Sequence, residues 1–251
     1  MIAFYIKNGG DFTNNGTIDF SSGKGNIGVY AQRNYKFDHD AGKLNVGTNA
    51  VGLYVKDATG EVNIKAPINL AASGTGTNAG TTIGIYSDGD AKVNFTDNTT
   101  LTIGEGAVGL YSSNPTNFDK TFTIANGKTL SVDLGKNSTF GLLNGATGTV
   151  NVGTYLKNNT INISSFGSGA SIFYTTGGAT TEIDKDYTVS NTTAGTNAST
   201  SVLVGTKGST VKVNNGINLT TGTNVGLIAT KGSGTGAASS TAINDGVIKS
   251  T

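Results

Sequence analysis

Several residue types that support common protein functions are missing or scarce in this sequence. The chain of 251 residues has no cysteine, which excludes a disulfide framework and a thiolate metal site. Its one histidine, His39, would have to serve any Ser-His-Asp triad. Charged residues make up only 13%, the formal net charge is +1, and the lysines are scattered singly. This balance argues against nucleic acid or an anionic membrane as the main partner.

Long apolar runs are also missing. The longest are fragments such as 51–55, far short of the roughly 20 residues that cross a bilayer, so we expect no direct membrane insertion by this chain. What is present is 38 glycines, with many Asn and Thr and only 2 prolines. The glycines have no three-residue period, which excludes collagen, and regularly spaced apolar residues disfavour disorder.

A short repeat phrase organises the chain. It reads small or apolar residue, glycine, apolar residue, tyrosine, as in Val51-Gly52-Leu53-Tyr54, and it decays in later copies. After a truncated first copy that ends at Tyr5, the copies are 27–30, 51–54, 83–86, 108–111, 140–143, 170–173, 200–203 and 225–228. Nine copies at a loose period exclude a compact domain with one central core.

Two further alternating segments follow each phrase, such as Val62-Asn63-Ile64 and Ile68-Asn69-Leu70 after Tyr54. A period of two residues indicates strands with the apolar member facing inward. Three short strands cannot bury their apolar side alone, so neighbouring units must stack. The sequence has no helical period and leaves no room for crossover helices. It therefore predicts an all-β, right-handed parallel β-helix of about nine coils, each with three short strands.

Asparagine and glycine fit the corners of such a coil, as at Asn126-Gly127 and Asn215-Gly216, because both tolerate left-handed backbone. We also expect Asn or Thr at equivalent positions to hydrogen-bond along the rod. Neither end shows a polar or helical cap. We therefore expect residues 1–251 to be a single β-helix segment from a longer rod, with Met1 added where it was cut.

The repeats resemble those of a known family. Asn15-Gly16-Thr17-Ile18-Asp19-Phe20, Gly28-Val29-Tyr30-Ala31 and Gly84-Ile85-Tyr86-Ser87-Asp88-Gly89 are similar to the passenger repeats of type V autotransporter adhesins, most of all the very large fusobacterial kind. The similarity covers the whole chain. It implies an outer-membrane translocation β-barrel elsewhere in the parent chain, display on the bacterial surface, and partners among glycans or proteins of host or other bacterial cells. We expect a non-enzymatic adhesin or stalk segment, or a purely mechanical spacer.

A carbohydrate-active β-helix enzyme is the alternative, because lyases, hydrolases and phage tailspikes share this fold. Glycoside hydrolysis usually needs two carboxylates about 5 to 9.5 Å apart. The candidate pairs are Asp88 with Asp90, Asp184 with Asp186, and Asp38 with Asp40 around His39. Each lies at or beside a turn, where Asp hydrogen-bonds its own backbone. We therefore predict no catalytic residues, and we place His39 on a solvated corner.

Metal and cofactor motifs are equally weak. No Gly-Gly-x-Gly-x-Asp recurs every nine residues, as calcium-binding repeats require. A calcium held by Asp88, Asp90 and a carbonyl is conceivable but rests on one turn. Stretches such as Gly74-Thr75-Gly76 lack the Lys-Ser/Thr and helix of a phosphate loop. We predict no metal and no cofactor.

The tyrosines of the repeat phrase are the candidate binding residues. Strand parity puts Val51, Leu53 and Val55 on one face, and Gly52 and Tyr54 on the other. If the aliphatic face is inside, the rings form an outer column beside a column of glycines, about 4.8 Å apart. The predicted ladder is Tyr5, Tyr30, Tyr54, Tyr86 and Tyr111. Such a strip could hold sugar rings or a partner's apolar side chains. A residue that recurs in every coil also fits a structural role, in which rings shield the strand edge or turn inward at the glycine.

Longer intervals between phrases predict loops that leave the rod, where repeat proteins usually place recognition. The expected excursions are 71–82, 114–121 and 186–201.

Overall fold

Parallel pairing between successive repeats builds a β-solenoid. The computed structural model describes residues 1–251 except 23, 58, 76–79, 146–147, 190–199, 222–224, 231–236 and 251. Sheet A takes one strand from every repeat phrase, in chain order: β1 (Ile2–Lys7), β4 (Ile27–Gln32), β7 (Val51–Lys56), β10 (Ile83–Asp88), β13 (Val108–Ser112), β16 (Thr139–Asn144), β19 (Ser171–Thr176), β22 (Thr200–Gly205) and β25 (Val225–Ala229). The predicted stacked parallel β architecture is confirmed, while the number of complete coils stays a prediction.

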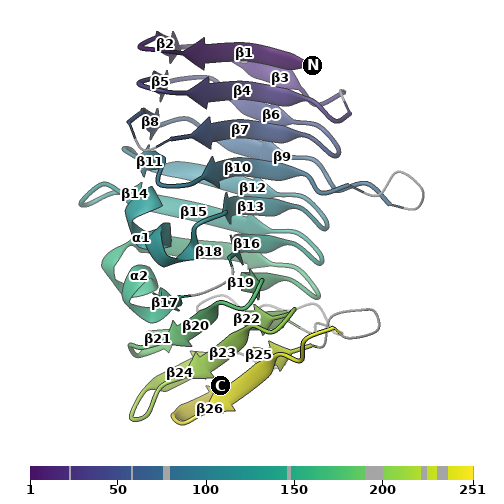
Figure 1. Ribbon diagram of the computed structural model, residues 1–251, viewed down its shortest axis with the longest axis vertical. Coiled ribbons are helices and arrows are strands. Elements are labelled where there is room, and N and C mark those ends of the chain that lie inside the picture. The colour runs from purple at the N-terminus through teal and green to yellow at the C-terminus, as the bar shows by residue number, and fades with distance from the viewer. Residues whose placement is uncertain are drawn as a thin grey trace.

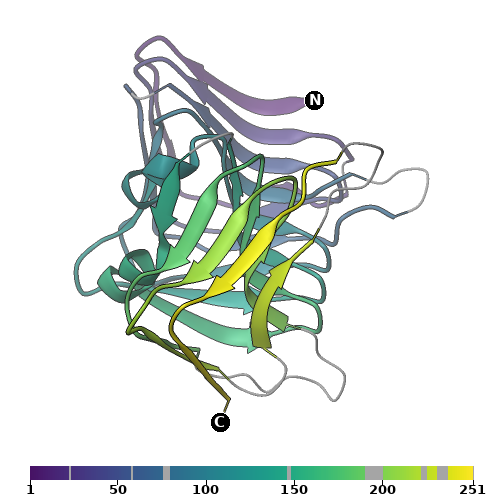
Figure 2. The same cartoon turned by 60° about the horizontal axis from the view of Figure 1, so that its bottom comes forward.

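Two more series of parallel strands run along the rod (Figures 1 and 2). Sheet B holds β2 (Asp11–Asn14), β5 (Lys36–His39), β8 (Glu61–Ile64), β11 (Lys92–Phe95) and β14 (Phe122–Ile124). Sheet C holds β3 (Ile18–Phe20), β6 (Leu44–Val46), β9 (Ile68–Leu70), β12 (Thr99–Ile103), β15 (Thr129–Leu134) and β18 (Thr160–Phe166). Nearer the C-terminus, sheet D holds β17 (Thr149–Asn151), β20 (Thr180–Ile183), β23 (Thr210–Val213) and β26 (Thr241–Asn244), and sheet E holds β21 (Tyr187–Thr188), β24 (Asn218–Thr221) and β27 (Val247–Ser250).

The interior is mainly a column of stacked apolar side chains, as the inward-facing positions of the strands predict. In the repeat that starts at β7, Leu53, Val62 and Ile64 are fully buried and Ile68 is 1% exposed. Their partners in the next repeat occupy the same depth, because Leu53 pairs with Ile85 and Val62 with Val93 in exact parallel register. Each repeat therefore supplies the surface that covers the next one.

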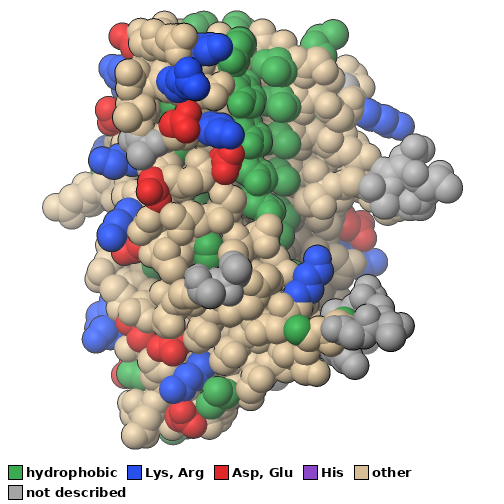
Figure 3. Space-filling model, viewed as in Figure 1, with side chains coloured by type: hydrophobic (Ala, Val, Ile, Leu, Met, Phe, Trp, Pro, Cys, Tyr) green, Lys and Arg blue, Asp and Glu red, His purple; other side chains and the backbone are tan. Residues whose placement is uncertain are grey.

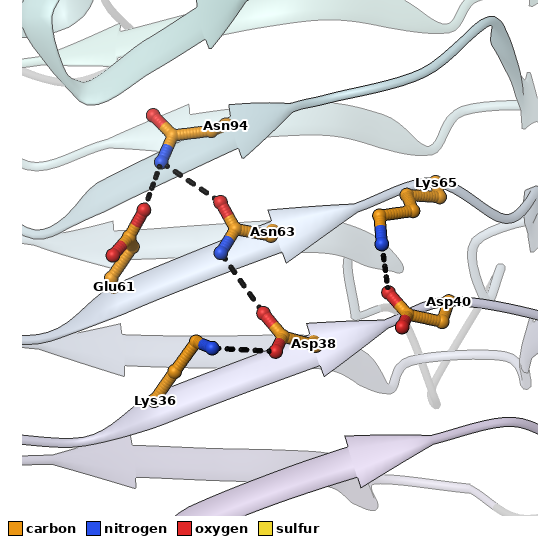
Figure 4. Close-up of polar contacts among 7 residues, drawn as sticks. All are labelled: Lys36, Asp38, Asp40, Glu61, Asn63, Lys65 and Asn94. Carbon is orange, nitrogen blue, oxygen red and sulfur yellow. Dashed lines mark hydrogen bonds and ion pairs between the residues drawn. The ribbon is translucent and has the colours of Figure 1, made fainter.

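Polar ladders run along the outside of the rod, as expected. On sheet B the Asn63 Nδ2 donates to Asp38 Oδ1 at 2.9 Å, and the Asn94 Nδ2 donates to Asn63 Oδ1 at 3.1 Å (Figure 4). On sheet C the Asn69 Nδ2 donates to Asn45 Oδ1 at 2.9 Å. Each rung joins residues about one repeat apart, so the amides link neighbouring coils rather than neighbouring residues.

Among the residues that the structure describes, two α-helices interrupt the rod, and the sequence pattern predicted no helix. The turn η2 (Pro115–Asn117) and helix α1 (Phe118–Thr121) occupy the expected excursion at 114–121. After the phrase at 140–143, the alternating segment that the repeat pattern predicts as a strand is Val150-Asn151-Val152. The strand ends at Asn151 and helix α2 (Val152–Asn158) begins at Val152, so the prediction is wrong for Val152. Both helices lie at the junction of sheets B and D (Figure 1). They bring Phe118 and Tyr155 into the core, with ring centroids 5.1 Å apart.

The other two excursions are only partly described. Residues 71–75 and 80–82 leave sheet C, and positions 76–79 lie outside the described residues. For the segment 186–201, β21 opens it and Thr200 already belongs to β22, while positions 190–199 lie outside the described residues.

Candidate functional site

The predicted tyrosine ladder exists as a continuous stack on sheet A. Ring centroids are 5.0 Å apart from Tyr30 to Tyr54, 4.7 Å from Tyr54 to Tyr86, and 4.4 Å from Tyr86 to Tyr111, with interplanar angles of 8°, 5° and 13°. Tyr5 meets Tyr30 edge-on at 5.2 Å. Parallel register explains the spacing, because each tyrosine pairs directly with the next along the sheet. Tyr5 is 55% exposed, and the other four are half-buried.

The column beside the tyrosines is aliphatic, so the prediction of neighbouring glycines is wrong. A Cβ on Gly52 would lie 2.8 Å from Val46 Cγ2, and one on Gly84 would lie 3.2 Å from Leu70 Cδ1, which places both glycines toward the core. Gly52 and Leu53 thus both face inward, and strict alternation fails between them. Val51 is left half-buried beside Tyr54, as are Ile27 and Ile83 in their own repeats. Figure 3 shows the resulting apolar band over β1 to β13.

Register also corrects the later copies of the phrase. Tyr111 pairs with Leu142, which pairs with Tyr174, and Tyr174 pairs with Val204. The phrase at 140–143 was therefore placed one residue too late, and those at 170–173 and 200–203 were placed one residue too early. Tyr174 is a half-buried tyrosine in the ladder column that the sequence analysis missed, and its aromatic ring beside Phe173 was the available signal.

The hydroxyl edge of the ladder is tied to neighbouring side chains. The Tyr54 hydroxyl donates to Asp88 Oδ2 at 3.1 Å, and the Asn144 Nδ2 donates to the Tyr111 hydroxyl at 2.5 Å. Burial, and then the Asp88 charge, raise the pKa of Tyr54 above its usual range. Burial and the neighbouring Tyr111 raise the pKa of Tyr86 to about 12. The rings of Tyr54 and Tyr86 are therefore neutral at physiological pH.

The first candidate acidic pair is used in structural contacts. The Asp88 carboxylate accepts hydrogen bonds from the Tyr54 hydroxyl and from Ser113 Oγ, the latter at 3.2 Å. It also forms an ion pair with Lys56 Nζ at 3.3 Å. Asp90 Oδ1 accepts from Asn114 Nδ2 at 2.9 Å and from Asn117 Nδ2 at 2.5 Å. Asp88 therefore supports the ladder, and Asp90 fixes the turn that enters η2.

The other two pairs also hold neighbouring elements together. Asp184 accepts from the Thr154 backbone amide at 2.8 Å, so its carboxylate caps the first turn of α2. Asp186 accepts from the Asn218 backbone amide at 2.7 Å, and this bond lowers the Asp186 pKa. Asp38 pairs with Lys36 at 3.0 Å and Asp40 with Lys65 at 2.9 Å (Figure 4).

His39 lies in the core, so its placement on a solvated corner is wrong. It is fully buried at the end of β5 and stacks on Phe37, with ring centroids 6.4 Å apart and planes at 7°. The Asn14 amide Nδ2 lies 2.9 Å from its Nδ1, which places the proton of the neutral ring on Nε2. Burial lowers the His39 pKa. The inward parity of β5 was the signal for this position.

Metal and membrane signals are absent from the described part of the chain. Within it, no group of three or more His, Cys, Asp or Glu side chains could hold a metal ion. No helix there is long and apolar enough to span a bilayer.

Comparisons with known proteins give no information on the function of this site. No protein family, curated protein or solved structure matches the chain.

The ladder and its aliphatic column offer a flat, rigid contact surface. Aromatic rings supply large apolar faces at little cost in conformational entropy, and these rings are already ordered by their neighbours. The charged groups nearby, Lys56 and Asp88, neutralise each other at the rim. This arrangement fits the binding of apolar or sugar-ring surfaces.

Proposed function

We propose that this chain is a non-enzymatic adhesin or stalk segment, displayed on the bacterial cell surface as part of an autotransporter passenger. The solenoid sets distance, and the tyrosine ladder makes contacts with glycans or proteins on other cells. The outer-membrane anchor belongs to other parts of the parent chain. The observation that carries the contact role is the half-exposed stack from Tyr30 to Tyr111 beside its aliphatic column.

Two features support this proposal over the enzyme alternative. Every candidate acidic pair has at least one member bound to a neighbouring repeat through a hydrogen bond, as Asp88 is to Tyr54 and Asp184 to Thr154. A general acid needs a carboxyl group that is free to protonate a leaving group. The ladder, in contrast, forms a continuous apolar strip of the kind that marks contact surfaces.

The following test distinguishes a role of the tyrosine ladder in binding from a purely structural role. In a Tyr54→Ala/Tyr86→Ala double variant, we expect adhesion of protein-coated beads to host or bacterial cells to fall. A matched control is Tyr174→Ala, which removes a half-buried ring from the same column. Its neighbours there are Leu142 and Val204 instead of further tyrosines. Adhesion of the control should match that of wild type.

Melting temperatures decide the outcome. Lost adhesion with Tm values similar in the double variant and the control supports a contact surface. Full adhesion by the double variant would mean that the ladder only shields the strand edge. If wild type itself binds neither cells nor a glycan array, the segment is a spacer and the contact role is wrong.

A further inference from the structure

Three parallel columns of side chains run along the outer face of sheet A. The ladder tyrosines form the middle column, between an aliphatic column and a polar rim, and Figure 3 shows the apolar part of this face on the surface of the rod. In chain order the aliphatic column is Ile27, Val51, Ile83 and Val108, and the rim is Lys7, Gln32, Lys56 and Asp88. Six successive strands, from β1 to β16, carry the face, so its midpoint lies between β7 and β10.

The ladder rings are stacked face to face, so the strip presents their edges as a row of ridges. From Tyr30 to Tyr111 the neighbouring centroids are 5.0, 4.7 and 4.4 Å apart. A guest ring between two neighbours would need about 7 Å, twice the contact distance of about 3.5 Å between carbon atoms. Ridges about 4.8 Å apart match the ridges of another stack of β-strands. This spacing favours a partner that is itself a β-solenoid.

We propose that this face binds a second copy of the chain, packed face to face with the two rods antiparallel. The inference rests on the contact role proposed for the ladder and names its partner. A two-fold axis that runs along the strands, between β7 and β10, sets Tyr54 against the partner's Tyr86 and Val51 against the partner's Ile83. Parallel rods would instead set the aliphatic column against the polar rim. The order of the columns therefore selects the antiparallel arrangement.

The rim charges are self-complementary in this arrangement. Within one copy, Lys56 Nζ and Asp88 Oδ2 are 3.3 Å apart, and their side chains are 42% and 32% exposed. Across the two-fold axis Lys56 faces the partner's Asp88, and Asp88 faces the partner's Lys56. The four charges then alternate in sign around the axis. Such an arrangement fixes the register of the two copies and disfavours a shift by one strand.

The size of the face sets the strength of the pairing. Six strands at about 4.8 Å, each up to six residues long at about 3.3 Å per residue, give a patch of about 600 Å² on each copy. A dimer would bury about 1,200 Å² in total, at the lower end of the range for specific interfaces. We therefore expect a concentration-dependent dimer with a Kd of about 10 μM to 1 mM.

Sedimentation equilibrium over this concentration range tests the dimer, and charge reversal tests its register. Lys56→Glu makes both charges of one copy negative, and Asp88→Lys makes both positive. Like charges then face each other in either homodimer, so the association constant should fall about tenfold. In an equimolar mixture each copy meets a partner of opposite sign, and the mixed dimer should form at least as tightly as the wild-type dimer.

Lys36→Glu is the matched control. Lys36 pairs with Asp38 at 3.0 Å on sheet B and is 49% exposed, so this variant also breaks a lysine–aspartate pair within one copy but lies off the proposed face. It should dimerise as wild type does. Val51→Thr/Ile83→Thr keeps β-branched side chains and makes the aliphatic column more polar. It should weaken the dimer about tenfold even if Asp88→Lys does not fold.

The inference fails if wild type stays monomeric at about 1 mM. It also fails if Lys56→Glu dimerises as wild type does, or if mixing the two folded charge variants does not restore the dimer. Circular dichroism and Tm values show which variants are folded. Monomeric wild type that still adheres to cells would leave the adhesion proposal standing with another partner. A dimer without adhesion to cells would support this inference and contradict the adhesion proposal.

Discussion

The Tyr54 hydroxyl donates a hydrogen bond to Asp88 Oδ2 at 3.1 Å, although the two residues are 34 positions apart in the chain. Parallel register produces this contact, because Asp88 pairs with Lys56 on the strand that carries Tyr54. Asp88, a member of one candidate acidic pair, therefore supports the ladder. Its carboxylate also accepts from Ser113 and so connects three successive repeats.

Replacing this carboxylate tests its role directly. We expect Asp88→Asn to lower the free energy of unfolding by about 1 kcal/mol, since it removes the ion pair with Lys56 and one charge-assisted acceptor. This loss corresponds to a fall in Tm of about 2–4 °C for a chain of this size. Asp119→Asn, which changes an exposed carboxylate without a described partner, should leave Tm unchanged. Calorimetry measures both.

The same variant tests the enzyme alternative. Wild type and Asp88→Asn should release no reducing ends from a panel of polysaccharides. If wild type shows turnover and Asp88→Asn abolishes it, the non-enzymatic proposal is wrong.

The ladder predicts a loss of stability at alkaline pH. Burial raises the pKa of Tyr86 from 10.0 to about 12, so the unfolded chain loses this proton first as pH rises. Stability from the neutral ring is complete below pH 10 and declines through the window between 10 and about 12. Urea unfolding across this range should show a shallower decline for Tyr86→Phe than for wild type. Equal slopes would mean that Tyr86 titrates as it does in the unfolded chain.

Much of the fold could be predicted because equivalent positions in successive repeats lie in the same environment, either in the core or on the surface. Val62-Asn63-Ile64 shows inward and outward positions by alternation alone, and the structure confirms both the buried pair and the outer Asn ladder. Alternation fails at Gly52, because glycine has no side chain whose polarity could reveal its direction. Parity counted from Tyr54 through the glycine therefore put Val51 on the wrong face.

Helix α2 was beyond sequence reasoning for a different reason. Its residues include Val152, Gly153 and Thr154, which have poor helix propensity, and Asn151 gives it no side-chain cap. The helix is stabilised by the carboxylate of Asp184, which follows three strands later in the chain, and by burial of Tyr155 and Leu156. Tertiary contacts of this kind leave no local pattern.

The inward-facing glycines give a prediction about packing. A Cβ at Gly84 would lie 2.6 Å from the Gly109 carbonyl oxygen, in the next strand of sheet A. Since backbone must shift to relieve this clash, Gly84→Ala should cost about 1–3 kcal/mol in urea unfolding. Gly226→Ala is the control at the corresponding position of β25, where an added Cβ meets nothing within 4 Å. Equal stability of the two variants would mean that the glycines face outward and that their inward orientation is wrong.

The buried histidine predicts a separate loss of stability in mild acid. Burial lowers the His39 pKa, so the unfolded chain takes up the proton first as pH falls. The stability contribution is complete above the unfolded value of about 6.5 and is lost as pH falls below it. His39→Ile places at this position the residue type of its register partner, Ile64, and removes the titrating group from the core.

We expect this variant to be insensitive to pH from 7 to about 5, where wild type weakens. Carboxylates with lowered pKa act in a lower window, as for Asp19, whose hydrogen bonds with Ser21 and Asn45 bring its pKa to about 2. Denaturant unfolding at several pH values separates the two effects. A parallel decline of wild type and His39→Ile between pH 7 and about 5 would show that His39 accepts its proton in the folded protein as readily as in the unfolded chain.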